Sequence, residues 1–309
     1  MFIGNNIRKV KKTKNMKNMT LSDLILSYIL FLKFYLKGLI RYSQHFKNSF
    51  SVMKNVLRKN YPIHAVLKNG TNIILNGRFE VAAIAAGYKN YTIDGELLVI
   101  KNELGTIKLK NGTQNGDPLG VFFEEQYKML PIKNHTVLDI GANMADSSIY
   151  FVLRGAKKVV ALEPLPANYD MATKNIELNN FKEVIKIILG ACSSKSGFFK
   201  VDEKKIGGSQ QLDNSRGEKE IPLISLTELF EQNNLDDPVV KIDCEGCEYD
   251  IILNTSDEIL KKFHSILIEY HYGYQNIVEK LENCGFKVKT SRPMYYSNYY
   301  LGYILATKN

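Results

Sequence analysis

The sequence predicts an α/β protein built on a doubly wound parallel sheet, preceded by a helical arm and a small β-rich subdomain. After Asp117, short apolar runs rich in Val and Ile alternate with amphipathic stretches, as in a parallel sheet covered by helices on both faces. Between residues 61 and 116, apolar and polar residues alternate around Asn-Gly turns, which is typical of short antiparallel strands. We therefore expect three parts: residues 1–60, 61–116 and 117–309.

The composition is that of a globular protein. The chain has 309 residues, of which 45% are apolar and 24% charged, so it can bury a core. Four cysteines are too few for a disulfide scaffold, and the N-terminus does not have the pattern of a signal peptide. We therefore expect a protein of the reducing cytoplasm.

The positive charge is concentrated in the arm. Residues 1–60 contain 13 Lys and Arg against one acid, Asp23, whereas the remaining residues contain 28 basic against 31 acidic side chains. Residues 21–40 form an apolar helical pattern with one cationic stripe, Lys33, Lys37 and Arg41, and the longest uncharged run is too short to span a membrane. Two interpretations remain open: the helix packs on the body of the protein, or residues 1–45 bind the surface of an anionic membrane.

The first candidate site begins in the segment TVLDIGANMADSS. Asp139 stands at the end of a predicted strand, Gly141 in the turn after it, and the next strand ends at Glu163. An acid at that second strand end can accept ribose hydroxyls, but a dinucleotide would require glycine where Asn143 and Asp146 stand. The pattern instead favours S-adenosylmethionine, which has no phosphate and carries two cationic groups. We expect Asp139, Gly141, Asn143 and Glu163 to bind it.

From about residue 121 onward the sequence resembles the FkbM family of S-adenosylmethionine-dependent methyltransferases. The segments that carry the resemblance are VLDIGANMADSSIYF, GAKKVVALEPLPANY, LTELF with KIDCEGCEYDII, and ILIEYH. The resemblance implies a Rossmann-like fold of the class I methyltransferase type and transfer of a methyl group to a sugar or polyketide-like hydroxyl. The family usually has a second glycine where this chain has Ala145, and residues 1–116 lie outside the resemblance.

The segment KIDCEGCEY contains two cysteines in a C-x-x-C spacing, Cys244 and Cys247. A redox pair or a zinc site would use them as thiolates, which the three neighbouring carboxylates disfavour, and no second close pair of zinc ligands is present. In the resembling family, small apolar residues usually stand at both positions. We therefore expect the cysteines to act as small buried apolar residues and the carboxylates to form the site.

Four residues at two neighbouring strand ends are candidates for the acceptor side. Asp243 and Glu245 share one face of the strand end, and Glu269 and His271 share a face at the end of the next strand. Asp243, Glu245 or His271 could accept the proton of a hydroxyl group, and Glu269 could orient its neighbours. The alternative for Asp243 is a structural ion pair with Lys241. We assign no metal ligand, although the same carboxylates could also hold a divalent cation.

The expected acceptor is a hydroxyl-bearing glycan, glycolipid or small metabolite. The chain lacks the Asn/Asp-Pro-Pro-aromatic run typical of amino methylation of bases, and neither Cys244 nor Cys247 follows a proline. Two alternatives are an RNA ribose methyltransferase and a non-catalytic module that binds membranes or polyanions. The negative charge of residues 61–309 counts against nucleic acid as a partner. The sequence therefore predicts a cytoplasmic enzyme that can also sit peripherally at a membrane.

Overall fold

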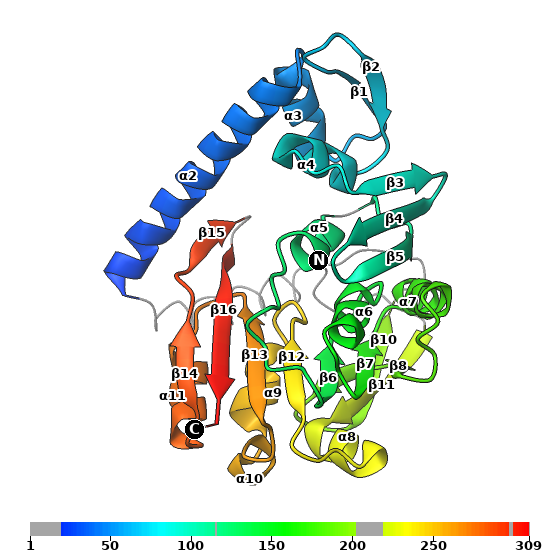
Figure 1. Cartoon of the computed structure of the whole chain (residues 1–309). Coiled ribbons are helices and arrows are strands. Elements are labelled where there is room, and N and C mark those ends of the chain that lie inside the picture. The colour runs from blue at the N-terminus through cyan, green and yellow to red at the C-terminus, as the bar shows by residue number, and fades with distance from the viewer. Residues whose placement is uncertain (1–19, 115, 202–218, 297–298, 309) are drawn as a thin grey trace. The chain divides into compact units, whose positions relative to one another are not determined.

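The computed structural model describes residues 20–114, 116–201, 219–296 and 299–308 (Figure 1). The described chain divides into two compact units, which we call the small unit, residues 29–127, and the large unit, residues 20–28 with 128–308. The boundary between them therefore falls after Tyr127 and within the first helix. The functional division into 1–60, 61–116 and 117–309 stays a prediction, and the basic residues before position 20 lie outside the described residues.

The small unit combines helices with two antiparallel sheets. Its helices are the later part of α2 (Leu21–His45), α3 (Ser49–Leu57), α4 (Arg78–Ala86) and α5 (Asp117–Phe122), and its strands are β1 (Ile63–Val66), β2 (Asn72–Leu75), β3 (Tyr91–Asp94), β4 (Leu97–Asn102) and β5 (Gly105–Lys110). β1 and β2 form a hairpin, and β3, β4 and β5 form a second sheet, as the alternating pattern predicts. The core includes Phe46, Val52 and Ile63.

Helix α4 interrupts the strands that the sequence predicts between residues 61 and 116. Its segment RFEVAAIAA is rich in alanine, the best helix former. The Glu80 carboxylate accepts hydrogen bonds from the backbone N–H groups of Asn76 and Gly77, which caps the first turn. Gly87 ends the helix with a φ of 79°, a left-handed conformation that glycine adopts without strain. Local capping and alanine content therefore outweigh the surrounding strand pattern.

The large unit is built on one sheet whose strands run in the order β14-β16-β13-β12-β6-β7-β8. Strand β16 is antiparallel to both of its neighbours, and the other neighbouring pairs are parallel. The strands of this sheet are β6 (Thr136–Ile140), β7 (Lys158–Glu163), β8 (Ile185–Leu189), β12 (Val239–Ile242), β13 (Ser265–Tyr270), β14 (Lys287–Thr290) and β16 (Tyr299–Thr307), with β15 (Met294–Tyr296) paired to β16. This order confirms the doubly wound α/β fold.

Helices connect these strands, and a second, smaller sheet lies beside them. The helices are α6 (Asp146–Leu153), α7 (Pro166–Leu178), α8 (Leu226–Asn233), α9 (Glu248–Asn254), α10 (Asp257–Leu260) and α11 (Gln275–Asn283). The smaller sheet has the order β10-β11-β9, formed by β10 (Gly197–Val201), β11 (Lys219–Ser225) and β9 (Ala191–Ser193). The sequence pattern predicts one strand across β8 and β9, which the structure separates at Gly190.

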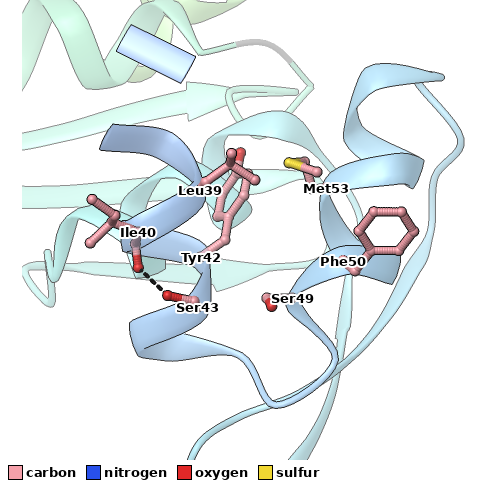
Figure 2. Close-up of a pocket in the computed structure, with 7 residues that line it drawn as sticks. All are labelled: Leu39, Ile40, Tyr42, Ser43, Ser49, Phe50 and Met53. Atoms are coloured by element: carbon pink, nitrogen blue, oxygen red, sulfur yellow. Dashed lines mark hydrogen bonds between the residues drawn. The ribbon is translucent and has the colours of Figure 1, made fainter. Parts of the chain in front are cut away.

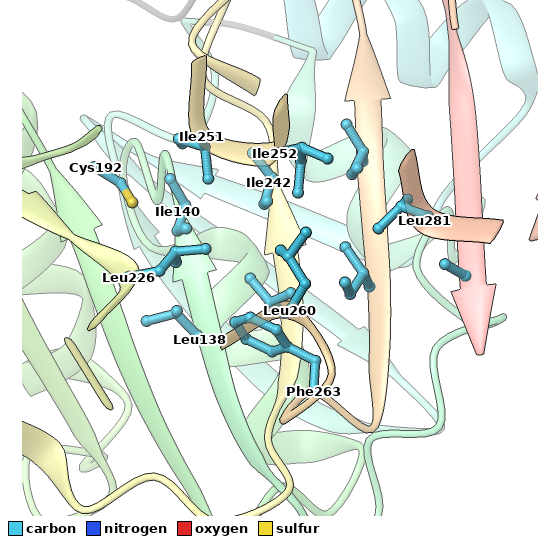
Figure 3. Packing of buried hydrophobic residues seen from close by; sticks show 14 of the residues in the cluster. Leu138, Ile140, Cys192, Leu226, Ile242, Ile251, Ile252, Leu260, Phe263 and Leu281 are labelled. Carbon is cyan, nitrogen blue, oxygen red and sulfur yellow. The ribbon is translucent and has the colours of Figure 1, made fainter. Parts of the chain in front are cut away.

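The main core lies between the sheet and the helices that cover one of its faces (Figure 3). Leu138, Ile140 and Ile242 project from β6 and β12, and Ile251 and Ile252 of α9 pack against them. All four residues of β12 are buried, the apolar Val239, Val240 and Ile242 together with the charged Lys241. Burial of each apolar side chain contributes about 1.5–3 kcal/mol, so this core fixes the ends of β6 and β12 side by side.

Helix α2 is the longest described helix. Near its start, Tyr28 stacks on Tyr295 of the large unit with ring centroids 4.7 Å apart. Near its end, Tyr42 packs against the core of the small unit. Among the described residues, none of the helices has both the length and the apolar character that crossing a membrane requires.

Candidate active site

The carboxyl ends of β7, β6, β12 and β13 lie in a row because these strands are parallel neighbours in the sheet. Ligands of such sheets bind outside the carboxyl ends of the strands. Each residue that the sequence assigns to the site stands at one of these four ends. The donor-side residues lie in the last two positions of β6 and β7 or in the loop after β6, and the acceptor-side residues lie near the end of β13 or in the loops after β12 and β13.

Asp139 is fully buried, and its carboxylate is held by side chains of the protein. One oxygen accepts hydrogen bonds from the hydroxyls of Ser147 and Ser148, at 2.7 and 2.6 Å. The other lies 3.2 Å from the Nζ atom of Lys241. These contacts fasten the first turn of α6 to the ends of β6 and β12. A direct contact of Asp139 with the donor stays a prediction. The contacts of Asp139 with Ser147, Ser148 and Lys241 fit a residue that holds the loop between β6 and α6 in place.

Glycine is required at position 141 because the loop after β6 approaches the loop after β12 closely there. Gly141 has a φ of 82°, and a Cβ atom at this position would collide with the carbonyl oxygen of Asp243. Its own carbonyl accepts a hydrogen bond of 2.7 Å from Lys241 Nζ. Ala145, at the position of the family's second glycine, has a φ of 66°, which costs a residue with a side chain about 1–2 kcal/mol. The left-handed backbone explains why glycine suits that position.

Glu163 and Asn143 meet at the end of β7. The Glu163 side chain is buried; Oε2 accepts a hydrogen bond from the Asn143 N–H at 2.9 Å, and Oε1 accepts one from the Leu165 N–H at 2.9 Å. Asn168 donates a weaker bond to Oε1 at 3.3 Å. Burial raises the pKa of Glu163 to about 7, against the effect of these hydrogen bonds. Because each oxygen has two lone pairs, Oε2 keeps one for a ligand hydroxyl.

The four candidate residues of the acceptor side come together in one cluster. The ligand atoms of Asp243, Glu269 and His271 all lie within 4.8 Å of one another. Glu245 Oε2 lies 3.4 Å from His271 Nε2. Lys241 Nζ lies 3.9 Å from Asp243 Oδ2, farther than from Asp139, so the ion pair considered for Asp243 is present but is not the main contact of Lys241.

The charges of this cluster shift the pKa values of its members. Burial alone would lower the pKa of His271, but the carboxylates of Glu248, Glu245 and Asp243 outweigh burial and raise this pKa to about 10. Burial and the charge of Asp243 raise the pKa of Glu269 to about 8, although His271 and a hydrogen bond from Tyr303 act in the opposite direction. The crowding of carboxylates around one imidazole contributes to both shifts.

Glu248 is a central residue of the cluster that the sequence analysis missed. It is the first residue of α9 and is fully buried. Its Oε1 atom accepts hydrogen bonds from the backbone N–H of His271 at 3.2 Å and from His271 Nδ1 at 2.9 Å, and its Oε2 accepts the Gly246 N–H at 2.8 Å. The available signal was that Glu248 is the third acid of the K-I-D-x-E-G-x-E block that carries the family resemblance.

Cys244 and Cys247 are joined by a disulfide. Both residues pack against the main core, as small apolar residues would. The disulfide itself was not predicted: the two side chains are covalently linked across Glu245 and Gly246. Among the described residues, neither cysteine belongs to a group of side chains that could hold a metal ion. The bond constrains the loop that carries Glu245.

The small unit contains an apolar hollow of about 280 Å³ between α2 and α3 (Figure 2). It is lined by Leu39, Ile40, Tyr42, Ser43, Ser49, Phe50 and Met53. This lining has no carboxylate, imidazole or amine, so it offers no group for proton transfer. The residues that the sequence assigns to the chemistry lie instead in the large unit.

The strand order, in which the antiparallel β16 joins an otherwise parallel sheet, is that of a Rossmann-like fold of the class I methyltransferase type, as the sequence predicts. The family model of the methyltransferase FkbM domain matches residues 139–288. Residues 139–288, a little under half of the chain, thus match an FkbM methyltransferase domain, in agreement with the family and the cofactor, S-adenosylmethionine, that the sequence predicts. The match extends from Asp139 to Val288 and includes every candidate residue.

Individual relatives are distant. An uncharacterized protein 158B of Sulfolobus islandicus rod-shaped virus 1 is 28% identical over 156 residues, which cover 50% of this chain and 72% of the viral protein. The M. capricolum TrmK structure with S-adenosyl-homocysteine is 20% identical and has a TM-score of 0.41, covering 61% of this chain and 68% of that one. A precorrin-6y C5,15-methyltransferase from Geobacter metallireducens is 14% identical with a TM-score of 0.39, covering 66% and 94%.

Proposed function

We propose that this protein transfers a methyl group from S-adenosylmethionine to a hydroxyl group of a glycan, glycolipid or small metabolite. The observation that carries the proposal is the cluster of Asp243, Glu245, Glu269 and His271 beside the donor-side residues of β6 and β7. A hydroxyl group is a weak nucleophile, so its methylation requires positioning and a group that accepts its proton. A cluster of carboxylates at the neighbouring strand ends supplies both.

The donor side fits the chemistry of the cofactor. S-adenosylmethionine supplies the methyl group on a positively charged sulfur. Glu163 accepts a ribose hydroxyl at the lone pair that its hydrogen bond with Asn143 leaves on Oε2. Asp139, Ser147 and Ser148 keep the loop around Gly141 in place. The surplus of carboxylates around the site also favours a cationic donor over a phosphate-bearing dinucleotide.

On the acceptor side, Asp243 and Glu245 are the proton acceptors in this proposal. Their side chains are partly exposed, with 27% and 23% of their surface accessible, so a substrate hydroxyl can reach them. Both nitrogens of His271 already face carboxylates, Glu248 at 2.9 Å and Glu245 at 3.4 Å. His271 is therefore better suited to orient Glu245 than to take the proton itself. Glu269 lies beside Asp243 and completes the wall of the acceptor site.

The test of the function is a transfer assay with methyl-labelled S-adenosylmethionine. We expect label on a hydroxyl oxygen when the full chain is incubated with pools of glycans, glycolipids and small hydroxyl-bearing metabolites, followed by mass analysis for one added methylene. Structured RNA is tested in parallel, because a ribose 2′-hydroxyl is the alternative acceptor. Label on RNA alone would contradict the proposed acceptor class, and binding of the donor without transfer to any pool would favour a non-catalytic module.

We also propose that the protein is a cytoplasmic enzyme attached peripherally to an anionic lipid surface through residues 1–45. Apolar side chains recur every three or four residues along one side of α2 and are largely exposed: Leu21, Ile25, Tyr28, Leu32, Leu36 and Leu39. The cationic stripe of Lys33, Lys37 and Arg41 runs beside them. A second copy of the chain would bring two strongly basic arms together, whereas anionic lipid complements their charge.

Vesicle flotation measures this attachment. Full-length protein is expected to float with vesicles that contain anionic lipid at low salt and to be released at high salt, because each cation near the surface contributes on the order of 1 kcal/mol and salt screens it. Replacement of Leu32 and Leu36 by serine should reduce flotation. Phe198→Ser is the matched control, since Phe198 is 74% exposed in the large unit. Flotation that is equal for all variants, or dimerisation lost in L32S/L36S instead, would contradict the lipid proposal.

A further inference from the structure

Three different kinds of metal-ligating side chain converge on the acceptor side of the site. Asp243 follows β12, Glu269 lies in β13, and His271 follows β13, and their ligand atoms lie within 4.8 Å of one another. A divalent cation bound at about 2.1–2.3 Å from each atom holds its ligands up to about 4.5 Å apart. Small side-chain rotations would therefore bring all three onto one ion. We propose that Asp243, Glu269 and His271 form a binding site for a divalent cation of the Mg²⁺ or Mn²⁺ type.

The orientation of His271 is the second observation that supports this site. Glu248 is fully buried and is not one of the three ligands, and it holds His271 Nδ1 at 2.9 Å and the backbone N–H of His271 at 3.2 Å. A carboxylate that fixes one ring nitrogen directs the other toward the metal in most histidine-ligated sites. Here the other nitrogen, Nε2, faces the cluster, where Glu245 lies 3.4 Å away.

The balance of charge points to the same ligand. Asp243, Glu245, Glu248 and Glu269 contribute four carboxylates around a single imidazole. Lys241 is the nearest ammonium, but it lies closer to the buried carboxylate of Asp139, at 3.2 Å, than to Asp243, at 3.9 Å. Carboxylate oxygens of this kind are the ligands that Mg²⁺ and Mn²⁺ prefer, so a dication suits these groups.

This site deepens the proposed function and rests on it for its catalytic role. A hydroxyl group bound to a divalent cation loses its proton more readily than one in water. When His271 Nε2 ligates the cation, the Glu245 carboxylate is released from its pairing with that nitrogen and can take the hydroxyl proton. The new bond then forms between the hydroxyl oxygen and the methyl carbon, and the electrons of the broken carbon–sulfur bond remain on sulfur.

A second group of side chains of similar composition provides the control. His135, Asp237 and His264 also have ligand atoms within 4.8 Å of one another. Asp237, however, already pairs with Lys308 and with His264, both at 2.8 Å. A cation there would compete with an ammonium, so we expect this group to bind none. Asp237→Asn therefore changes a carboxylate of comparable surroundings without touching the proposed site.

The experiment is a titration of the full-length protein with Mn²⁺ alone, followed by electron paramagnetic resonance and calorimetry. We expect one Mn²⁺ per chain. Affinity should fall at least about tenfold in Glu269→Gln and in Asp243→Asn, and about 10–100-fold in Glu248→Gln, which acts through His271. Asp237→Asn should bind as the unchanged protein does. Thermal unfolding of each variant without metal establishes that it is folded. If either Glu269→Gln or Asp243→Asn does not fold, the other variant still tests the site.

Absence of Mn²⁺ binding at millimolar concentration overturns the proposal. Binding that survives in both Glu269→Gln and Asp243→Asn but is lost in Asp237→Asn also overturns it, because the ion would then occupy the other group. The titration contains no methyl donor, so its result is independent of the proposed reaction. A protein that binds Mn²⁺ at this site but fails to bind S-adenosylmethionine would keep the metal site and refute the function.

Discussion

Replacement of Glu245 by glutamine is expected to lower the turnover number of methyl transfer by about 10²–10⁴-fold and to leave the dissociation constant of S-adenosylmethionine unchanged. Glutamine has the shape of glutamate but cannot accept a proton, and general base catalysis contributes a factor of this size. Glu245 follows β12 and lies next to His271, away from the Glu163 carboxylate that the donor is expected to contact. Single-turnover kinetics and calorimetry of donor binding measure the two quantities separately.

Asp243→Asn is expected to lower turnover in the same range, but with a second effect. Because Asp243 is also a proposed ligand of the cation, its loss should weaken Mn²⁺ binding, whereas Glu245→Gln should leave Mn²⁺ binding intact. Glu258→Gln is the control for both, since Glu258 has 84% of its side chain exposed on α10 and only a surface pair with Lys262. An equal loss of donor affinity and turnover in Glu245→Gln would place Glu245 on the donor side instead.

The fold of the large unit could be predicted from the sequence because its strands are buried on both faces. In strand β7, Val159 to Leu162 are all buried and appear as an uninterrupted apolar run, which is typical of a strand covered on both faces. The sequence predicts β8 and β9 as one strand, since no charge or proline separates them. Gly190 stands between them, and a Cβ atom there would meet Ile224 and Pro222 at 3.2 Å, a packing constraint across the chain that a local pattern does not contain.

The acids of the candidate site could be predicted because their position at strand ends follows from the fold. The role of each acid within the site could not be predicted, because these roles depend on contacts between residues that are far apart in the sequence. Glu248 was not assigned to the site, because its contact with His271 joins residues that are 23 positions apart. Gly141 was expected to bind the donor, and a Cβ atom there would meet the carbonyl of Asp243, which no local pattern indicates. The disulfide between Cys244 and Cys247 likewise depends on the turn geometry and not on the spacing alone.

Affinity for S-adenosylmethionine is expected to fall as the pH decreases below about 7, and Glu163 is the cause. Burial raises the pKa of Glu163 from 4.5 to about 7, so this carboxyl group becomes protonated near neutral pH. The protonated form loses acceptor capacity, and a ribose hydroxyl then loses its partner. The folding stability of the donor-free protein depends on pH in the opposite direction, because the buried site favours the neutral form of Glu163. The stability that Glu163 contributes is therefore present below pH 4.5 and is lost as the pH rises through about 7.

Glu163→Gln tests this assignment. It should weaken donor binding by about 1–3 kcal/mol, which is roughly 5–150-fold, because a buried hydrogen bond is left unmade. It should also remove the pH dependence, since glutamine does not titrate. Calorimetry of donor binding between pH 5.5 and 8.5 gives both results, with Glu177→Gln on α7 as the control, whose side chain is 45% exposed and pairs only with Lys182 at the surface. If the unchanged protein binds the donor equally well across this range, Glu163 does not contact the ribose in its charged form. If Glu177→Gln alters the profile as strongly as Glu163→Gln does, the pH dependence arises elsewhere.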